Sequence, residues 1–338
     1  MKTLLGLKTK ELEQVALSLG LETYRGRQLA QWIYRKRVTS FESMTDLGVD
    51  VRQKLLEKFE INVLHVHDTY CHQDGTTKYL FKLQDQELIE AVRIPHRQWE
   101  TICLSTQVGC PIGCRFCASG KDFVRNLTAA EIISQVLHTI QKKTANLVFM
   151  GIGEPLLNHT EVIRSLRILN TEVGIGARHL TVSTIGIVKG IEKLTHLGME
   201  VNLGISLHAP EDALRRKLIP ADLPRIRDIL KTVDQYFQKT GRRISFEYVM
   251  LSGVNDHMKQ ATNLARLLQP YDFKYHVNLI PYNETESGFK RSSPGQIHLF
   301  KECLEENGLN VTIRKERGRS IQAACGQLRR HHLETNPI

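Results

Sequence analysis

Cys110-Pro-Ile-Gly-Cys114-Arg-Phe-Cys117 is the stretch around which the chain is organised, because it places three cysteines at a C-x3-C-x2-C spacing. Gaps this short let one loop fold back and direct three thiolates at a common point, as iron–sulfur and zinc sites require. A structural zinc site takes four protein ligands, and no fourth cysteine or histidine stands nearby at a matching spacing. The spacing therefore favours a [4Fe–4S] cluster with one iron open to a ligand, and leaves zinc or no metal as the alternatives.

From residue 100 onward, strand-like segments alternate with helical ones. The strand candidates are 102–106, 146–151, 179–184, 201–207, 243–251, 275–281 and 310–315. The first helix between them begins at Thr128 with Glu131 three residues later, a capping box, and the last begins at Ser293-Pro294 and ends at Gly308. Repeated βα units indicate a parallel sheet, and six units are too few for a closed eight-fold barrel. The sequence therefore predicts an α/β fold with a partial (β/α)6 barrel.

A small helical module precedes this core. Two sets of apolar residues recur at helical spacing: Leu12, Val15, Ala16 and Leu19, then Leu29, Trp32 and Ile33. Basic residues lie between and around them, at 24–28 and 35–37. We interpret residues 1–60 as a helical accessory domain, which either contacts a nucleic-acid backbone or caps the core.

The period of the sequence changes at about residue 62. Segments 63–70 and 77–83 have β character and flank Asp74-Gly75, which is a hairpin signal. Segment 88–94 has the pattern of a third strand, so we expect a small sheet that links the helical module to the core. The predicted organisation is a helical domain at 1–60, a β-rich linker at 61–99, the core at 100–330 and a C-terminal tail at 331–338.

The charge of the chain indicates an acidic partner. The 338 residues carry a net charge of +10, from 46 basic and 36 acidic residues. This balance favours a polyanion such as nucleic acid, with solvated surface charge as the alternative. The basic residues cluster at 35–37, 215–217, 314–319 and 329–330.

The expected location is the cytoplasm, without membrane contact. No apolar run approaches the ~20 residues that are needed to span a bilayer. The N-terminus lacks the long apolar core and the cleavage site of a signal peptide. Seven cysteines, an odd number with three crowded together, suit reduced thiols and a metal better than a disulfide framework.

Chemically distinctive residues follow the ends of the predicted strands. In chain order they are the three cysteines, Gly151-Ile-Gly153-Glu154-Pro155, Ser183-Thr184, Ser206-Leu-His208, Asn283 and Cys325. In parallel α/β folds the carboxyl ends of the strands share one face, where active sites lie. We therefore expect these segments to converge on one mouth.

The cysteine spacing, with Phe116 before the third cysteine, resembles the signature of radical S-adenosylmethionine enzymes, and 151–155 resembles their glycine-rich motif. Nearly the whole chain is similar to the RlmN/Cfr family of RNA adenine methyltransferases, and most similar to its RlmN branch. The matching stretches include Arg125-Asn-Leu-Thr128, Gly174-Ile-Gly-Ala-Arg-His179, Ser206-Leu-His-Ala-Pro210, Glu247-Tyr-Val-Met250, Val277-Asn-Leu-Ile-Pro-Tyr-Asn283 and Ala323-Ala-Cys-Gly-Gln-Leu328. The resemblance implies a radical S-adenosylmethionine barrel and an N-terminal RNA-binding domain.

The resemblance also implies two cofactors, a [4Fe–4S] cluster and S-adenosyl-L-methionine. Cys110, Cys114 and Cys117 would hold the cluster, and its open iron would take the amino and carboxylate groups of S-adenosylmethionine. Reductive cleavage of that cofactor gives methionine and a 5′-deoxyadenosyl radical. The positions that match family cofactor contacts are Gly153, Glu154, Ser183, Ser206, Leu207, His208 and Asn283.

Three further residues gain roles from the same resemblance. Cys325 would take a methyl group and become S-methylcysteine, and the carbon radical formed on that methyl group would add to adenine. Glu90 matches the proton acceptor at the attacked carbon, and Cys103 matches the thiol that releases the RNA by forming a disulfide with Cys325. Without the resemblance, Glu90 and Cys103 are ordinary strand residues and Cys325 is a small buried hydrophobe.

The leading hypothesis is methylation of carbon 2 of an adenosine in the peptidyl transferase centre of 23S rRNA and in the anticodon loop of some tRNAs. The enzyme would be a monomer supplied with electrons by a donor such as flavodoxin. The nearest alternative is the Cfr-type reaction at carbon 8, which confers antibiotic resistance. A radical enzyme that modifies a protein would leave Cys103 and Cys325 surplus, and the remaining alternative is a non-catalytic, zinc-containing RNA-binding protein.

Overall fold

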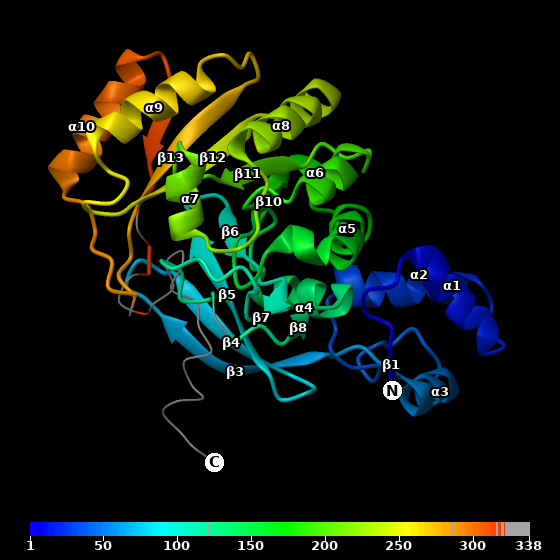
Figure 1. Cartoon of the computed structure of the whole chain (residues 1–338). Coiled ribbons are helices and arrows are strands. Elements are labelled where there is room, and N and C mark those ends of the chain that lie inside the picture. Colours follow the sequence, from blue (N-terminus) through cyan, green and yellow to red (C-terminus); the bar gives the residue numbers. More distant parts are fainter. Residues whose placement is uncertain (121, 286, 316, 319–320, 322–338) are drawn as a thin grey trace.

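Among the residues that the structure describes, seven parallel strands form the centre of the fold. They are β6 (Glu100–Cys103), β9 (Ala145–Phe149), β10 (Leu180–Thr184), β11 (Asn202–Ser206), β12 (Ile244–Met250), β13 (Tyr275–Pro281) and β14 (Val311–Ile313). Each pairs in parallel with the next one in this order. Side chains such as Leu147, Val182 and Phe246 are fully buried, as expected for a parallel sheet that is covered by helices. The six predicted βα units are present, and the predicted partial α/β barrel is confirmed (Figure 1).

The computed structural model describes residues 1–120, 122–285, 287–315, 317–318 and 321. Within these residues the helices of the barrel lie on the outside of the curved sheet (Figure 1). They are α4 (Ala129–Thr139), α5 (His159–Ile168), α6 (Val188–Thr195), α7 (Asp212–Leu218), α8 (Ile226–Thr240), α9 (Met258–Leu268) and α10 (Pro294–Glu306), with short turns η2 (Pro155–Asn158), η3 (Leu169–Val173) and η4 (Ala177–His179).

Two of these helices begin where the sequence predicts. Thr128 Oγ1 accepts a hydrogen bond from Glu131 N at 3.2 Å, and Glu131 Oε2 accepts one from Thr128 N at 2.8 Å, which completes the capping box of α4. Ser293 caps α10, because its Oγ accepts a hydrogen bond from Gln296 N at 3.2 Å. Both predicted helix starts are confirmed.

The strands that precede the barrel belong to the same sheet. β3 (Leu64–Cys71) and β4 (Thr77–Leu83) form the expected hairpin, and β5 (Leu88–Pro95) pairs antiparallel with both β4 and β6. We expected a small linking sheet, whereas these strands extend the barrel sheet to ten strands in the order β14-β13-β12-β11-β10-β9-β6-β5-β4-β3. After β5 the chain turns at 96–99 and enters β6 directly beside it. The free edge of β6 is therefore the nearest pairing partner for β5. The predicted domain boundaries stay a prediction.

The N-terminal helices lie to one side of the barrel (Figure 1). They are α1 (Thr9–Ser18), α2 (Tyr24–Ala30), η1 (Gln31–Arg35) and α3 (Val49–Lys58), with a two-strand pair of β1 (Lys2–Thr3) and β2 (Phe59–Glu60). Arg164 of α5 donates to both carboxylate oxygens of Glu11, at 2.7 and 2.8 Å. Arg35 donates to Val173 O at the end of η3, at 2.9 Å. Charged hydrogen bonds therefore fasten the helical unit to the barrel.

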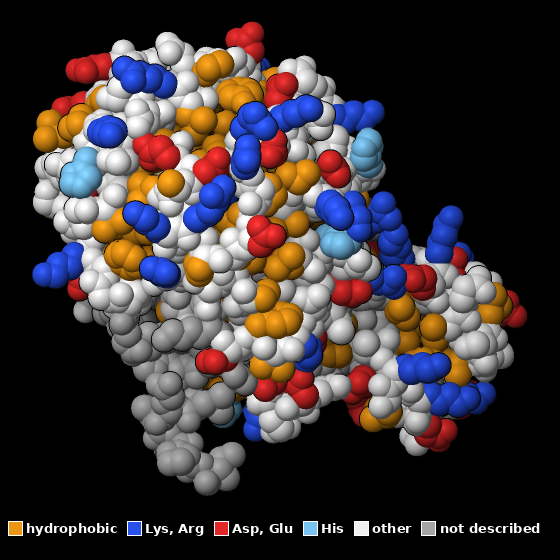
Figure 2. Space-filling view, viewed as in Figure 1, with side chains coloured by type: hydrophobic (Ala, Val, Ile, Leu, Met, Phe, Trp, Pro, Cys, Tyr) orange, Lys and Arg blue, Asp and Glu red, His pale blue; other side chains and the backbone are white. Residues whose placement is uncertain are grey.

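Part of the predicted basic surface is used inside the protein. Arg37 donates to Ile140 O at 3.0 Å, and the Lys36 ammonium lies 3.2 Å from the centre of the Trp32 ring. Other Lys and Arg side chains stay at the surface, and several surround the concave junction between the N-terminal helices and the barrel (Figure 2). None of the helices in the described part of the chain is long and apolar enough to cross a membrane.

Close packing of α2 on α1 gives a prediction for Gly26, where a Cβ would stand 2.3 Å from Glu13 N. We expect Gly26→Ala to lower the free energy of unfolding by about 2 kcal/mol or more, because backbone atoms cannot yield. Gly295→Ala is the control. Nothing lies within 4 Å of its added Cβ, so alanine there should raise the free energy of unfolding by about 0.5–1 kcal/mol. Chemical denaturation measures both, and effects of the same sign would contradict this packing.

Candidate active site

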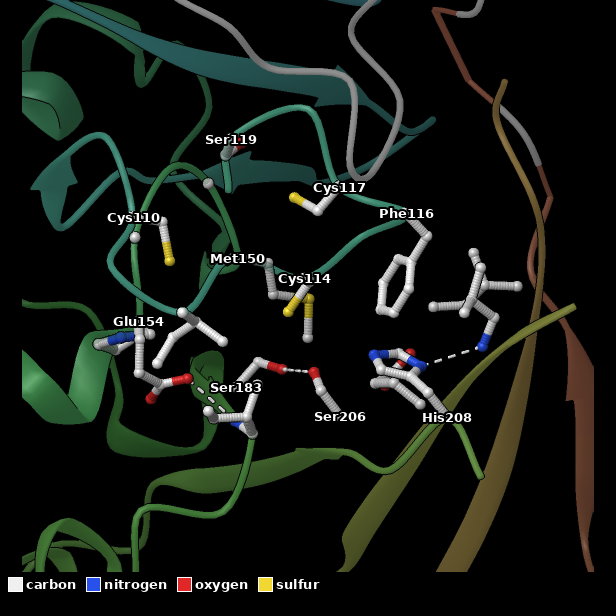
Figure 3. A pocket seen from close by; sticks show the side chains of 18 of the residues that line it. Cys110, Cys114, Phe116, Cys117, Ser119, Met150, Glu154, Ser183, Ser206 and His208 are labelled. Atoms are coloured by element: carbon white, nitrogen blue, oxygen red, sulfur yellow. Dashed lines mark hydrogen bonds between the residues drawn. The ribbon is translucent and has the colours of Figure 1, made fainter. Parts of the chain in front are cut away.

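The carboxyl ends of the parallel strands enclose a pocket of about 960 Å³, counting the part that opens to solvent. Most of the predicted site residues line it: Cys110, Cys114, Cys117, Gly153, Glu154, Ser183, Ser206, His208 and Asn283. Figure 3 shows the cysteine loop on one side of the pocket and Ser183, Ser206 and His208 on the other. Segments that are far apart in the sequence therefore meet at one mouth.

Backbone hydrogen bonds and apolar packing hold the cysteine loop. Cys117 N donates to Cys114 O at 3.0 Å, which forms a tight turn. Arg115 N donates to Leu218 O at 2.9 Å and ties the loop to the end of α7. A small apolar cluster packs against the cysteines and includes Ile112, Phe116, Ala209, Leu218 and Ile219. The loop is thus supported on its apolar side while the sulfurs face the pocket.

Burial disfavours the thiolate form of two cysteines in this loop. Burial raises the pKa of the Cys110 thiol to about 12, and burial raises the pKa of the Cys114 thiol well above its usual range. Hydrogen bonds from the backbone of Ile112 and Glu154 to Cys110 act in the opposite direction. A bound cluster takes thiolates, so its assembly must release protons from these groups. Hydrogen bonds to sulfur are also among the factors that set the reduction potential of a cluster.

The donor set suits a cluster better than a single ion. Among the residues that the structure describes, no three Cys, His, Asp or Glu side chains are arranged to hold one metal ion. In a [4Fe–4S] cluster each cysteine binds a different iron, so the thiolates surround a volume instead of a point. Three cysteines that border an open pocket fit that requirement.

Gly151 and Gly153, which follow β9, allow this segment to pack closely against residues 104–107. A Cβ on Gly151 would stand 2.7 Å from Leu104 O. Gly153 has a φ of +104°, and a Cβ there would lie 2.6 Å from Gln107 Cβ. Gln107 Oε1 accepts a hydrogen bond from Glu154 N at 2.8 Å. Gln107 therefore holds the glycine-rich segment in place, and no sequence pattern distinguishes it from other residues ahead of the cysteines.

The carboxylate of Glu154 is buried and oriented by backbone amides. Oε1 accepts a hydrogen bond from Leu156 N at 3.0 Å, and Oε2 accepts one from Ile185 N at 2.9 Å. Burial raises the pKa of Glu154 to about 6, and these hydrogen bonds limit the rise. The Thr184 side chain also hydrogen-bonds to this carboxylate, and two carboxylate oxygens have about four acceptor sites in all. The carboxylate is therefore able to accept a further donor from the pocket.

Hydroxyl and imidazole groups form the facing wall. Ser183 and Ser206 belong to neighbouring strands, and their hydroxyl oxygens lie 3.4 Å apart. The backbone of His208 has a φ of +60°, and its Nδ1 accepts a hydrogen bond from Val249 N at 3.1 Å. Burial lowers the pKa of His208 to about 3. The ring is therefore neutral at physiological pH, with its proton on Nε2.

Arg215 supports this wall from behind, although its sequence context placed it in a surface cluster. Its buried guanidinium donates to Leu207 O at 3.0 Å, to Ser206 O at 3.2 Å and to Ile185 O. Leu207 does not line the pocket, because its side chain is fully buried and its N–H donates to Glu247 O at 3.0 Å. Leu207 could therefore influence a cofactor only indirectly, through Ser206 and His208, which do line the pocket.

Glu247 and Arg314 add charge to the pocket, and both line it. Glu247 Oε1 accepts a hydrogen bond from Ser245 Oγ at 2.9 Å, and Oε2 accepts one from Asn278 Nδ2 at 2.8 Å. Arg314 Nη1 lies 3.9 Å from Glu247 Oε2. Neither residue gains a role from the sequence motifs. Glu247 could have been noticed in the sequence, because it is a carboxylate inside the otherwise mostly apolar strand β12.

Glu90 and Cys103 lie on the face of the sheet that continues into the pocket. Cys103 pairs with Val92 across β5 and β6, and both belong to a small apolar cluster that contacts Met150, a pocket residue. Glu90 precedes Val92 by two residues and so shares its face. The Cys103 side chain is buried. Cys325 lies outside the described residues, so its methylation and its pairing with Cys103 stay predictions.

Family comparisons agree with this fold and site. Residues 104–265 match the Radical SAM superfamily, and residues 2–61 match the Ribosomal RNA large subunit methyltransferase N-terminal domain. With the partial barrel and the cysteine-lined pocket, the first match defines a radical S-adenosylmethionine enzyme. Such enzymes use a [4Fe–4S] cluster and S-adenosylmethionine, and the prediction of these two cofactors is confirmed.

Relatives of full length narrow this class. A Thermotoga neapolitana protein named "Probable dual-specificity RNA methyltransferase RlmN" is 45% identical over 100% of both chains, and an Alkaliphilus oremlandii protein of the same name is 45% identical over 98% of both. A crystal structure of a radical SAM methyltransferase from Sphaerobacter thermophilus has a TM-score of 0.94 and 39% identity, covering 98% of this chain and 100% of that one. The chain belongs to the RlmN family of RNA methyltransferases, which confirms the predicted family and enzyme class.

The position of Arg215 predicts a large loss of stability when its charge is removed. Arg215→Gln leaves three buried carbonyl groups without their donor, so the free energy of unfolding should fall by about 3 kcal/mol. The neighbouring Arg216 is exposed, and Arg216→Gln should change it by less than about 0.5 kcal/mol. Denaturant unfolding of the two variants provides the comparison. Similar small losses would show that the guanidinium does not support the wall.

Proposed function

We propose that this enzyme methylates carbon 2 of adenosine, in the peptidyl transferase centre of 23S rRNA and in the anticodon loop of some tRNAs, through an S-methylcysteine at Cys325. The observation that carries this proposal is the 45% identity over the whole chain to relatives named as dual-specificity RNA methyltransferases. The cysteine-lined pocket, with Glu90 and Cys103 on the adjoining face of the sheet, supports it.

Cys110, Cys114 and Cys117 would hold the cluster through their thiolates. An aromatic adenine carbon is not a nucleophile, so a polar transfer of a sulfonium methyl group to it is unfavourable. When bound, the cluster and S-adenosylmethionine supply the methyl group for Cys325, the radical that removes a hydrogen atom from it, and an acceptor for the electron that the RNA adduct gives up.

The other pocket residues would orient S-adenosylmethionine. Glu154 would accept hydrogen bonds from its amino group, because two backbone amides already direct the carboxylate into place. The hydroxyl groups of Ser183 and Ser206 and the amide of Asn283 provide donors and acceptors for its polar groups. Neutral His208 would add a wall that carries no charge near the sulfonium.

Cys103 and Glu90 would complete the reaction after the methylene carbon has bonded to the base. Glu90 would accept the proton from carbon 2. The thiolate of Cys103 would then attack the sulfur of Cys325. The S–S bond forms, the bond between sulfur and methylene breaks, and the methylene carbon takes the electron pair and then a proton. The product is a methylated adenosine and a disulfide that must be reduced before the next cycle.

The RNA would lie across the N-terminal helices at 1–60 and the mouth of the barrel in the core at 100–330. A flavodoxin-like donor would supply electrons, and we place the enzyme in the cytoplasm as a monomer. Surface Lys and Arg side chains beside the junction of the two parts provide the charge that an RNA backbone needs (Figure 2).

The pKa of Glu154 predicts how cofactor affinity varies with pH. The ionised carboxylate holds the amino group by a stronger hydrogen bond than the neutral acid does. With a pKa of about 6, its ionised fraction falls from about nine-tenths at pH 7 to about one-tenth at pH 5. The Kd for S-adenosylmethionine should therefore rise about tenfold between pH 7 and pH 5. Calorimetry on cluster-loaded protein measures it. Glu154→Gln should bind more weakly and without this pH dependence, and an unchanged pH dependence in that variant would contradict the role of Glu154.

The target carbon and the covalent route can be tested together. The cluster-loaded enzyme, a reductant and S-adenosylmethionine are incubated with a 23S rRNA fragment or tRNA that carries deuterium at adenine carbon 2. We expect a methyladenosine that has lost the deuterium, as measured by mass spectrometry. Cys325→Ala should lower the rate of RNA methylation by about 100-fold or more, as expected when a nucleophile is lost. Cys103→Ala should accumulate a protein–RNA adduct that survives denaturing electrophoresis.

Cys303→Ala is the matched control, because Cys303 is a partly buried cysteine of α10 outside the pocket. It should methylate RNA at the parent rate. If the methyladenosine keeps its deuterium, carbon 2 is not the target, and the carbon 8 reaction becomes the better explanation. Normal methylation by Cys325→Ala would refute the covalent route, and the absence of RNA methylation under all conditions would favour a protein substrate.

A further inference from the structure

A buried ion pair joins Glu90 to Lys78 of β4. Lys78 Nζ lies 2.9 Å from Glu90 Oε1, and the side chains are 9% and 1% exposed. Glu90 is also held through its backbone, because Ser105 Oγ donates to Glu90 O at 2.6 Å. A lysine and a glutamate are rarely buried this deeply unless they are paired. Neither composition nor motif pointed to Lys78.

The strand register places this pair beside the pocket. Tyr70, Lys78, Val92 and Cys103 pair in turn across β3, β4, β5 and β6, so their side chains form one row on one face of the sheet. Val92 and Cys103 contact Met150, which lines the pocket. The Lys78 ammonium is therefore on the face where Cys103 lies, and it reaches diagonally to Glu90 in the next row.

The charges around Glu90 favour its ionised form. The Lys78 ammonium also lies 5.1 Å from the centre of the Tyr70 ring, whose hydroxyl donates to Asp68 Oδ2 at 2.7 Å. Among the described residues of β3 to β6, the strand register also places Lys82, His65 and the Cys103 thiol on this face. Helix α4 packs on the opposite face, where His138 contacts Phe81. The Lys78 ammonium thus contacts the Glu90 carboxylate directly, at 2.9 Å, and Lys82 stands four residues further along β4.

We propose that Lys78 is a positioning residue that holds Glu90 as an oriented carboxylate, ready to accept the carbon 2 proton of the RNA adduct. This inference rests on the proposed function. A carboxylate buried without a cation would take up a proton and lose its basicity. In the assisted step the bond between carbon 2 and hydrogen breaks, its electron pair enters the purine ring, and the proton bonds to a Glu90 oxygen. Lys78 keeps its charge throughout.

A second buried pair of similar geometry provides a matched control. Arg93 Nε lies 2.8 Å from Glu100 Oε2, with side chains 12% and 0% exposed. Arg93 is adjacent to Val92 in β5 and so points to the opposite face from Lys78 and Glu90. Substitution of Arg93 removes a buried cation from the same sheet, but it leaves the face that carries Lys78 and Glu90 unchanged.

The test follows the proton itself. Cys103→Ala protein is used as the parent, because its adduct with RNA cannot be released by the second thiol. RNA with deuterium at carbon 2 is converted to the adduct, and mass spectrometry follows the loss of deuterium with time. We expect Lys78→Met to slow this loss about tenfold or more, the effect of removing one charged hydrogen bond. Lys78→Arg should restore the rate to within about threefold, and Arg93→Met should match the parent.

The variants separate this inference from the function on which it rests. Glu90→Gln should retain the deuterium. If Glu90→Gln loses it at the parent rate, or if no adduct forms at all, the proposed function fails whatever Lys78 does. If Glu90→Gln retains the deuterium while Lys78→Met loses it at the parent rate, only the role of Lys78 is overturned.

The parent alone gives a test that does not depend on the folding of a variant. With Lys78 in place, the rate of deuterium loss should stay above half its maximum down to about pH 5, near the ordinary range of a glutamate. In folded Lys78→Met the half-maximal pH should move upward by about one unit or more. A parent profile that is half-maximal at about pH 6 or higher would overturn the inference.

Discussion

One buried guanidinium holds the mouth of the barrel in shape. Beyond the last ladder bond, the carbonyl groups of a parallel strand have no strand partner, and where they are buried they also lack water. Arg215 donates to such carbonyls on two neighbouring strand ends, at Ile185, Ser206 and Leu207. The peptide after Thr184 is bonded on both sides, because Ile185 N donates to Glu154. The orientation of the Glu154 carboxylate therefore depends on a side chain that never enters the pocket.

Much of the fold could be predicted from local sequence, because it depends on local chemistry. The βα alternation follows from the spacing of apolar residues, and the capping box at Thr128 marks a helix start that the backbone must obey. The cysteine motif carries its own geometry, since three thiols in one short loop can only face a shared volume. Parallel strand order then brings distant strand ends together without further information.

The remaining features depend on contacts between distant segments. No local pattern says that β5 will pair with β6, and that pairing is what brings Lys78 and Glu90 to the face beside the pocket. Charge clusters were misleading for the same reason. Arg215 is buried and Arg37 bonds to a backbone carbonyl, although their neighbours in sequence suggested an RNA-binding surface. Whether an arginine faces solvent or a carbonyl is decided by tertiary packing.

The fastening of the N-terminal helices to the barrel has a consequence for the substrate. The Arg164–Glu11 pair, the bond from Arg35 to η3 and a shared apolar core join the helical unit to the barrel. A ligand that touches both parts must fit the distance between them, so the ligand has to adapt its own shape. For an RNA, this change of shape is the turning of one adenosine out of its stack. Under the proposed function, such an enzyme would select loops by how readily they yield a base, and loops of unlike sequence would qualify.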